Sequence, residues 1–339
     1  MKTLSTEILV IGGGAAGLSA AAEAAAAGAK VLVAESDLHL GGQLLKQTHK
    51  FFGSKDEYAG TRGFKIADIL LSEIDSCKEN VEIHTNTTIT GFYSEDGTFT
   101  AMRGEEKYFH IKAKKTIVAT GAQERLIPFP NNDLPGVYGA GAVQTLMNVY
   151  GVVPGKRVLM VGAGNIGLIV SYQLMQAGVE VAAVVEAAPR VGGYWVHAAK
   201  IRRMGVPILL RHSIRKAVGD QVITGAYITA LNDRFEPEGE ETYVDCDVIC
   251  IAVGLSPTTE ILSQAGCKMM YVPQLCGLVA RRDRTMKTST PDFFTAGDAS
   301  GIEEASAAMV EGRIAGLSAA ADLGYPTEHG KLDEYWGRL

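Results

Sequence analysis

The sequence contains the same glycine-rich pattern twice, with an offset of 150 residues. Residues 8–35 read ILVIGGGAAGLSAAAEAAAAGAKVLVAE, and residues 158–186 read VLMVGAGNIGLIVSYQLMQAGVEVAAVVE. Each copy has an apolar run, a G-x-G-x-x-G motif, helix-favouring residues, an Ala-Gly pair, a second apolar run and a terminal glutamate. Continuous apolar runs are typical of buried parallel strands. Each copy therefore predicts a β-α-β unit, and the long offset indicates a duplicated domain rather than a short solenoid repeat.

Each glycine of the repeated motif has a physical role at its position. The first permits the tight turn from strand to helix, the second lets a pyrophosphate approach the backbone, and the third lets the helix pack on the strand. The residues that open each helix offer free N–H groups and the positive end of the helix dipole to phosphates. The pattern therefore predicts two dinucleotide sites. The first comprises Gly12, Gly14, Ala15, Ala16 and Gly17, and the second comprises Gly162, Gly164, Asn165, Ile166 and Gly167.

The second strand of each unit ends in a glutamate. Glu35 and Glu186 lie 23 and 24 residues after the first glycine of their motifs. This is close to the spacing of about 20 residues that is typical of a carboxylate binding ribose hydroxyls. An acid at this position disfavours a 2′-phosphate, so Glu186 favours NAD over NADP. Arg190 follows four residues later, within reach of a 2′-phosphate, and keeps NADP as the alternative.

Composition narrows the class of protein. The chain has 39 glycines among 339 residues, a larger share than the usual 7% or so, without a collagen-like period. Its net charge of -6 argues against nucleic acid as a partner. No uniformly apolar segment reaches the roughly 18 residues of a membrane span, and the N-terminus lacks the pattern of a signal peptide. We therefore expect a cytoplasmic protein with no membrane partner. The histidines lack metal-ligand spacing, so we also expect no metal site.

In the order of its motifs the chain resembles the flavoproteins with two dinucleotide-binding domains, the pyridine nucleotide–disulfide oxidoreductase superfamily. Four further segments carry the resemblance: TIVATG (116–121), DVICIAVGLSP (247–257), FFTAGD (293–298) and EEASAAMVEGRIAGLS (303–318). The resemblance implies an α/β fold of two Rossmann-like domains, each with three ββα layers. An NAD-type domain of residues 126–283 would be inserted into a discontinuous FAD domain of residues 1–125 and 284–339.

The resemblance also implies which residues contact the cofactors. Asp298 would bind the ribityl or phosphate part of FAD, with Ala305 and Ser306 near the isoalloxazine ring. The FAD residues beyond the first glycine motif would be Glu35, Gly42, Gln43, Thr88, Thr120, Gly121, Gly297, Asp298, Ala305 and Ser306. Glu186 and Gly254 would complete the NAD-type site. Lys46 and His49 lie in a loop expected to approach the flavin, and they are the candidate catalytic residues for proton transfer; a solvated loop is the alternative.

Two departures from the family pattern bear on function. Disulfide reductases need two neighbouring cysteines beside the flavin, and neither of the corresponding segments, 41–45 and 137–143, contains one. Cys246 and Cys250 have C-x-x-x-C spacing and are expected to be buried small hydrophobic residues. Dithiol chemistry is therefore disfavoured. The arginines at positions 281, 282 and 284 predict a solvated charged loop, with a docking patch for an acidic partner as the alternative.

A narrower resemblance lies in GGQLLKQTHKFFGS (41–54) and GVYGAGAVQTLMNVYG (136–151). These segments are similar to the flavoprotein alpha subunits of multi-subunit dehydrogenases that act on amines and amino acids. The likeness implies an FAD-dependent oxidoreductase that moves electrons between flavin and NAD(H) or a partner flavoprotein, acts with a small-molecule substrate, and forms a homo- or hetero-oligomer. Two alternatives stay open. One is a non-catalytic or electron-relay scaffold subunit whose second site holds ATP, ADP or nothing. The other is a stand-alone NADH:acceptor reductase.

Overall fold

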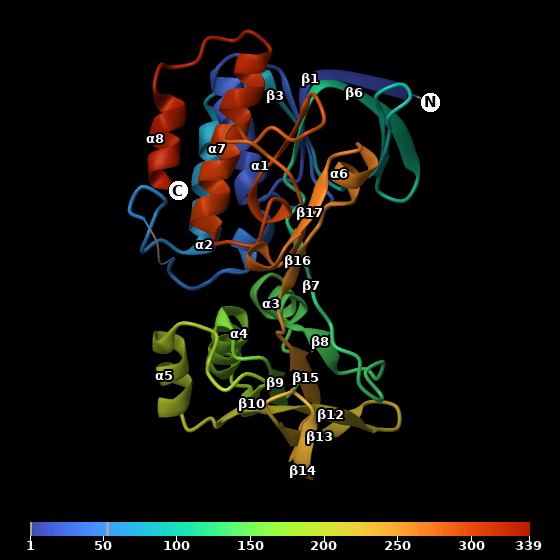
Figure 1. The fold of residues 1–339 in the computed structure, drawn as a ribbon, viewed down its shortest axis with the longest axis vertical. Coiled ribbons are helices and arrows are strands. Elements are labelled where there is room, and N and C mark those ends of the chain that lie inside the picture. Colours follow the sequence, from blue (N-terminus) through green and yellow to red (C-terminus); the bar gives the residue numbers. More distant parts are fainter. Residues whose placement is uncertain (1, 52–53) are drawn as a thin grey trace. The chain divides into compact units, whose positions relative to one another are not determined.

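A computed structural model describes residues 2–51 and 54–339, which fall into two units (Figure 1). Unit 1 comprises the chain up to Gln123 and again from Ser256 to Leu339, and unit 2 comprises Glu124–Leu255. The chain crosses between them in β7 (Ala122–Glu124) and β16 (Leu255–Pro257), which pair with each other. Each unit is built on one of the two glycine-rich repeats.

The sheet of unit 1 has the strand order β3-β2-β1-β6-β5-β4, with β19 paired to β6. Strands β1, β2, β3, β6 and β19 are parallel, whereas β4, β5 and β6 pair antiparallel. The strands are β1 (Lys2–Ile11), β2 (Val31–Ala34), β3 (Val81–His84), β4 (Thr87–Tyr93), β5 (Thr98–Arg103), β6 (Lys107–Val118) and β19 (Phe293–Thr295). Along β1, Ile8 and Val10 face the helical core while Leu9 and Ile11 face a second core on the other side. This alternation is what a strand buried on both faces requires.

Most helices of unit 1 pack with α1 in the core on one face of the sheet, whereas α6 belongs to the core on the other face. The α-helices are α1 (Ala15–Ala26), α2 (Gly63–Asp75), α6 (Glu260–Gln264), α7 (Ala305–Asp322) and α8 (Lys331–Arg338). The short 3₁₀ helices are η1 (Gly42–Lys46), η2 (Lys78–Asn80), η3 (Pro273–Leu275) and η4 (Gly297–Ala299). A Cβ on Gly312 would lie 2.2 Å from the carbonyl oxygen of Ala16, and one on Gly316 would lie 2.2 Å from that of Ala20. The small residues of α1 and α7 therefore let their backbones touch.

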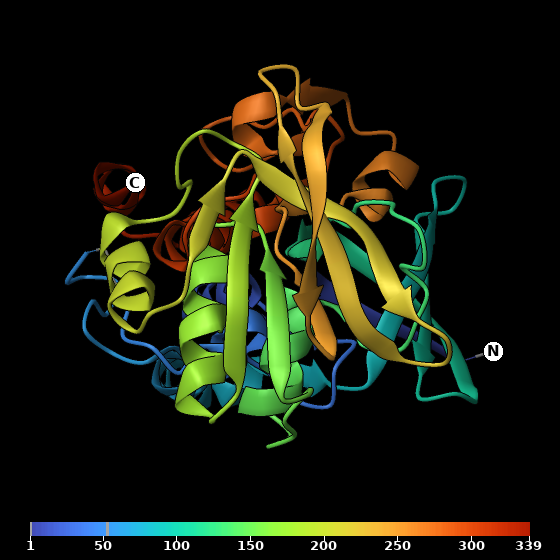
Figure 2. The same ribbon diagram turned by 90° about the horizontal axis from the view of Figure 1, so that it is seen from below.

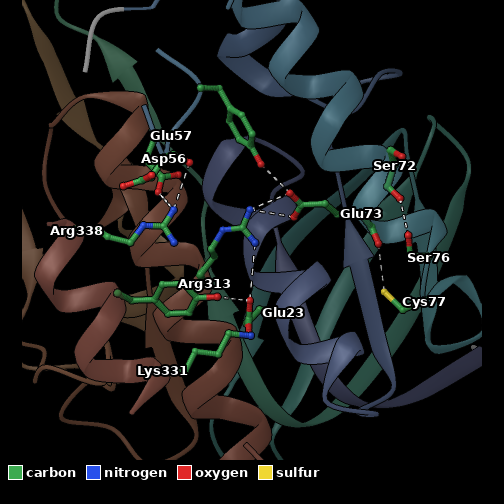
Figure 3. Close-up of polar contacts among 12 residues, drawn as sticks. Glu23, Asp56, Glu57, Ser72, Glu73, Ser76, Cys77, Arg313, Lys331 and Arg338 are labelled. Carbon is green, nitrogen blue, oxygen red and sulfur yellow. Dashed lines mark hydrogen bonds and ion pairs between the residues drawn. The ribbon is translucent and has the colours of Figure 1, made fainter. Parts of the chain in front are cut away.

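A partly buried charge network links α8 to this helical layer (Figure 3). Arg313 on α7 contacts both carboxylate oxygens of Glu73 on α2 at 3.0 Å. Glu23 on α1 accepts a hydrogen bond of 2.7 Å from the Tyr335 hydroxyl and pairs with Lys331 at 2.5 Å. Buried carboxylates require such partners because an unpaired charge is costly away from water. Four helices are therefore joined by charge as well as by apolar packing.

Unit 2 is also built on a parallel sheet with helices on one face, and an antiparallel sheet covers its other face. Its parallel sheet has the order β11-β10-β9-β15-β8, with β8 (Val137–Gly139), β9 (Arg157–Val161), β10 (Glu180–Glu186), β11 (Ile208–Leu210) and β15 (Val248–Ile251). One face carries α3 (Ala140–Asn148), α4 (Asn165–Gln176) and α5 (Trp195–Arg203). The other carries an antiparallel sheet of β12 (His212–Gly219), β13 (Ile223–Leu231) and β14 (Pro237–Asp245). Figure 2 shows these yellow to gold strands as a layer apart from the green parallel strands. The predicted α/β class with ββα layers is confirmed.

The chain returns to unit 1 earlier than the predicted boundary at residue 283. Residues 256–283, including α6, β17 (Met269–Val272) and β18 (Gly277–Ala280), belong to unit 1. The reason is packing, because Leu262 and Ala280 are buried in one core with Leu9 and Phe99. Among the described residues, no helix has the length and hydropathy that crossing a membrane requires.

Candidate nucleotide-binding sites

The first glycine-rich turn joins the end of β1 to the start of α1. Gly12 has a φ of +108°, and a Cβ there would lie 2.3 Å from the carbonyl oxygen of Ala119. A Cβ on Gly17 would lie 1.8 Å from the carbonyl oxygen of Gly12. In unit 2, Gly162 and Gly167 show the same crowding, each with a Cβ contact of 2.2 Å. Close backbone packing therefore requires glycine at the first and third positions of each motif, because a Cβ there would clash with a carbonyl oxygen.

The middle glycine of each motif faces open space instead. The nearest atom to a Cβ on Gly14 is the Cα of Gly42, at 4.0 Å, and nothing lies within 4 Å of one on Gly164. Each of these glycines is the N-cap of its helix, and neither helix has a side-chain cap. The first turn of a helix leaves N–H groups without intrahelical partners. Space and donors thus coincide where a pyrophosphate would bind, so the residues present fit a dinucleotide.

The terminal glutamates hold these turns in the same way in both units. The Gly13 N–H donates to Glu35 Oε2 at 2.6 Å, and the Ala163 N–H donates to Glu186 Oε2 at 2.7 Å. Oε1 of Glu35 accepts a hydrogen bond of 2.7 Å from the Asp37 N–H. Oε1 of Glu186 likewise accepts one of 2.9 Å from the N–H of the residue two positions further along the chain. Both acids are therefore fixed at the edge of the open space, with lone pairs left for ribose hydroxyls.

A Gly-Gly pair lies against each glycine-rich turn, and only the pair in unit 1 was predicted from the sequence. The Gly41 N–H donates to the Gly13 carbonyl at 2.8 Å, and the Gly193 N–H donates to the Ala163 carbonyl at 2.9 Å. Gly42 follows with a φ of +51°. The signal was present in the sequence, because LGGQ (40–43) and VGGY (191–194) both follow the acidic strand. The duplication thus extends beyond the two βαβ units.

Gly297 and Asp298 lie beside the start of α1. Gly297 has a φ of +68°, and a Cβ there would lie 2.8 Å from the Cβ of Ala16. Burial raises the pKa of Asp298 to about 6, assisted by the negative charges of Glu311 and Glu303. Helix α7 begins seven residues later at Ala305, and its first turn contains Ser306. The structure therefore brings the late motif next to the first glycine-rich turn.

The remaining predicted residues occupy more varied positions. Thr120 donates its hydroxyl to the Thr258 carbonyl at 2.6 Å, and the following Gly121 has a φ of +72° with open space at its Cβ position. In unit 2, Gly254 has a φ of +118°. Thr88 is exposed on β4, whereas its neighbour Thr87 is buried and donates its N–H to the Glu35 carbonyl at 2.7 Å. Thr87 is thus the residue that meets the acidic strand.

The candidate catalytic residues share one loop. Gln43 is exposed in η1, Lys46 ends η1, and His49 stacks on Phe51 with ring centroids 6.1 Å apart. The side chains of Lys46 and His49 are both partly buried. Phe52 and Gly53, which belong to the same sequence motif, lie outside the described residues.

Comparison with known proteins gives the family. The model of the pyridine nucleotide-disulphide oxidoreductase family matches residues 6–312. The chain belongs to this family. The match confirms the predicted superfamily and the oxidoreductase class, with FAD and a pyridine nucleotide as the cofactors that this family uses.

Several relatives of this oxidoreductase are named as parts of larger enzymes. An opine oxidase subunit of Agrobacterium tumefaciens (strain Ach5) is 29% identical over 343 residues, which cover 94% of this chain and 66% of that protein. The alpha subunit of sarcosine oxidase from Corynebacterium sp. (strain P-1) is 27% identical over 335 residues, which cover 94% of this chain and 33% of that protein. The chain thus spans between a third and about two thirds of the length of these relatives.

A solved structure supports the fold of this family member. The thioredoxin reductase of T. acidophilum superposes with a TM-score of 0.76 at 22% identity, over 94% of this chain and 99% of that one. The likeness covers both dinucleotide-binding units and agrees with their ββα layers.

The cysteines of this oxidoreductase are poorly placed for disulfide chemistry. Cys246 and Cys250 are buried and free, as the sequence predicted. Burial raises the pKa of the Cys246 thiol to about 12 and that of Cys250 further still. The thiolate is the reactive form of cysteine, so neither side chain is reactive near neutral pH. Among the described residues there is no cluster of three or more His, Cys, Asp or Glu side chains that could hold a metal ion.

Proposed function

We propose that this protein is an FAD-dependent oxidoreductase that passes electrons between its flavin and NAD(H) or a partner flavoprotein. We further propose that it is one component of a multi-subunit dehydrogenase or oxidase acting on an amine or amino acid. The observation that carries the proposal is the repeated cradle: an open middle glycine, an uncapped helix and a fixed glutamate in each unit. The names of the relatives supply the reaction class.

Unit 1 would hold FAD, which supplies the redox chemistry when bound. The turn from Gly12 to Gly17 would bind its pyrophosphate, and Glu35 would accept hydrogen bonds from ribose hydroxyls. Gly42, Gly297 and Asp298 border the same turn. Lys46, at the end of η1, and His49, three residues later, would hold or deliver a proton at the reacting edge of the cofactor. These assignments require no dithiol.

Unit 2 would hold NAD in preference to NADP. The two N–H donors on Glu186 stabilise its negative charge, and this charge would repel a 2′-phosphate. Replacing Glu186 by Gln should weaken NADH binding about tenfold, a typical effect of losing a charged hydrogen bond. The ratio of NADH to NADPH affinity should fall with it. Glu35→Gln is the matched control, because it changes the equivalent acid of unit 1 and should leave this ratio unchanged.

Anaerobic stopped-flow mixing of the FAD-loaded protein with NADH tests the electron route. We expect the flavin absorbance to bleach, because NADH in unit 2 would reduce the flavin in unit 1. A protein that binds FAD but is not bleached by NADH would instead support the scaffold subunit with ATP, ADP or nothing in unit 2. A protein that cannot be reconstituted with FAD would refute the proposal. Steady turnover of the isolated chain with an artificial acceptor would favour a stand-alone reductase.

A further inference from the structure

Glu311 on α7 is a buried carboxylate on which donors from two other segments converge. Its Oε2 accepts a hydrogen bond of 2.8 Å from the Gly297 N–H and one of 2.6 Å from the Ser300 hydroxyl. Its Oε1 pairs with the guanidinium of Arg282. The Glu311 side chain is only 5% exposed. One carboxylate therefore joins α7 to the Gly297–Ser300 turn and to the segment that precedes β19.

The same residues touch the first glycine-rich turn of unit 1. A Cβ on Gly297 would lie 2.8 Å from the Cβ of Ala16, and one on Gly312 would lie 2.2 Å from the Ala16 carbonyl oxygen. Gly312 directly follows Glu311 in the chain. The Glu311 side chain and its neighbouring backbone thus fix the Gly297–Ser300 turn against the part of α1 that would bind phosphate. Asp298 lies within this turn, so its position depends on the Glu311 hydrogen bonds.

The contact between Glu311 and the Gly297–Ser300 turn depends on charge as well as on packing. Burying a carboxylate is unfavourable unless a counter-charge and hydrogen-bond donors accompany it. Burial raises the pKa of Glu311, and Arg282, Ser300 and the Gly297 N–H oppose that rise. The charged groups that act on Asp298 are Glu311 and Glu303. Glu311 therefore influences Asp298 in two ways, through the backbone of the turn and through its negative charge.

We propose that Glu311 is a positioning residue for FAD, with Arg282 as its counter-charge: it holds the Gly297–Ser300 turn so that Asp298 faces the ribityl and phosphate part of the cofactor. This inference rests on the proposed function of unit 1. Neither Glu311 nor Arg282 needs to touch the cofactor. Both act through the turn that carries Asp298.

Fluorescence titration of the full-length apo-protein with FAD tests this role. Glu311→Gln should raise the dissociation constant about tenfold or more, because the neutral amide supports the turn less well and leaves Arg282 unpaired. Arg282→Met should have a similar effect. The double variant should lose less FAD affinity than the product of the two single losses, because the buried carboxylate and its counter-charge are then both gone.

Glu23→Gln is the matched control. Glu23 is also a buried, cation-paired glutamate of unit 1, but it lies two turns further along α1 than the phosphate-binding end. This variant should lower the melting temperature and leave the FAD dissociation constant within about twofold. Glu311→Gln should weaken FAD binding even when both variants are compared at a temperature where they are fully folded.

The pH dependence of FAD affinity is a second test, because a merely structural role of Glu311 would leave it unchanged. An ionised Asp298 accepts hydrogen bonds from cofactor hydroxyls, so affinity should fall as the pH drops through the Asp298 midpoint. Glu311→Gln removes a like charge that raises the pKa of Asp298, so the midpoint should move to lower pH. Glu23→Gln should keep the wild-type midpoint, and Asp298→Asn should abolish the dependence. Wild-type affinity and midpoint in Glu311→Gln would overturn the proposal, whereas a wild-type protein that binds no FAD would overturn the FAD site itself.

Discussion

Glu35 Oε2 accepts a hydrogen bond of 2.6 Å from the Gly13 N–H. Glu186 and Ala163 repeat this contact at 2.7 Å in unit 2. The acid at the end of the second strand therefore has a structural task besides its expected contact with ribose, because it holds the glycine-rich turn in place. The two repeats preserve this contact although their helices share few residues.

Gly14→Ala should weaken FAD binding strongly without unfolding the protein. Gly14 has φ −82° and ψ −167°, which an alanine can adopt, and a Cβ there would enter only the open space in which we propose that the pyrophosphate binds. We expect the free energy of unfolding of the apo-protein to change by no more than about 0.5 kcal/mol, while bound FAD falls at least about tenfold. The FAD content of purified protein and urea unfolding of the apo-form measure the two effects.

Gly164→Ala is the control for that experiment. It makes the same change in unit 2, where nothing lies within 4 Å, and it should preserve FAD while weakening NADH binding. Equal FAD content in wild type and Gly14→Ala would contradict the assignment of the first site.

Gly312→Ala should destabilise the helical layer of unit 1. The added Cβ would lie 2.2 Å from the Ala16 carbonyl oxygen, so α1 and α7 would have to separate. Such overpacking costs about 1–3 kcal/mol. Gly337→Ala provides the contrast, because Gly337 lies in α8 with nothing within 4 Å and should gain up to about 1 kcal/mol from helix propensity. Thermal and urea unfolding measure both, and equal stability of the two variants would be inconsistent with the close α1–α7 contact.

Arg338→Met should cause a pH-dependent loss of stability. Arg338 pairs with Glu57, whose side chain is 1% exposed and whose pKa is raised by burial. Without the arginine, a buried carboxylate would be left unpaired at pH 7, at a cost of about 3 kcal/mol. A group whose pKa is raised in the folded state adds stability below its unfolded pKa and loses it as the pH rises through the folded value. The defect should therefore shrink as the pH is lowered towards 5.

Two further variants test the origin of this defect. Glu57→Gln combined with Arg338→Met should recover part of the lost stability. Arg284→Met breaks an exposed pair with Asp333 and should cost less than about 1 kcal/mol. A defect of Arg338→Met that is the same at pH 5 and pH 8 would count against the buried carboxylate as its cause.

Reduction of the protein should consume two electrons per FAD and no more. Cys246 and Cys250 are buried with raised pKa values, so they should neither accept electrons from the flavin nor react with thiol reagents in the native state. Cys276 is the partly exposed cysteine, and it should be labelled first at pH 8. Anaerobic titration with dithionite measures the electron count. Four electrons per FAD would reveal a redox dithiol.

Part of this architecture could be predicted from short, continuous segments of the sequence. The strand, turn, helix, strand and acid of each repeat are consecutive, so their order and spacing encode the turn directly. This made the glycines, Glu35 and Glu186 predictable as a set. The late segment from Phe293 to Asp298 was also recognisable, although its neighbours in space were not.

Other features were decided by contacts between distant segments. The arginines at 281, 282 and 284 were expected to lie in a solvated loop. Arg281 and Arg284 are exposed as expected, but Arg282 pairs with the buried Glu311. Likewise, the chain returns to unit 1 before the predicted boundary at residue 283, because Leu262 and Ala280 complete a core that includes residues of β1. Charge and hydropathy along the chain do not specify which distant partner a side chain meets.

The sequence by itself determined the duplicated nucleotide-binding units, because each is made from one continuous segment with a fixed backbone requirement at every glycine. Only the tertiary structure decided which residues support those units from outside. Glu311 became important because folding places its carboxylate 2.8 Å from the N–H of Gly297, a residue 14 positions earlier in the chain. A carboxylate buried there must find its partners wherever the chain brings them.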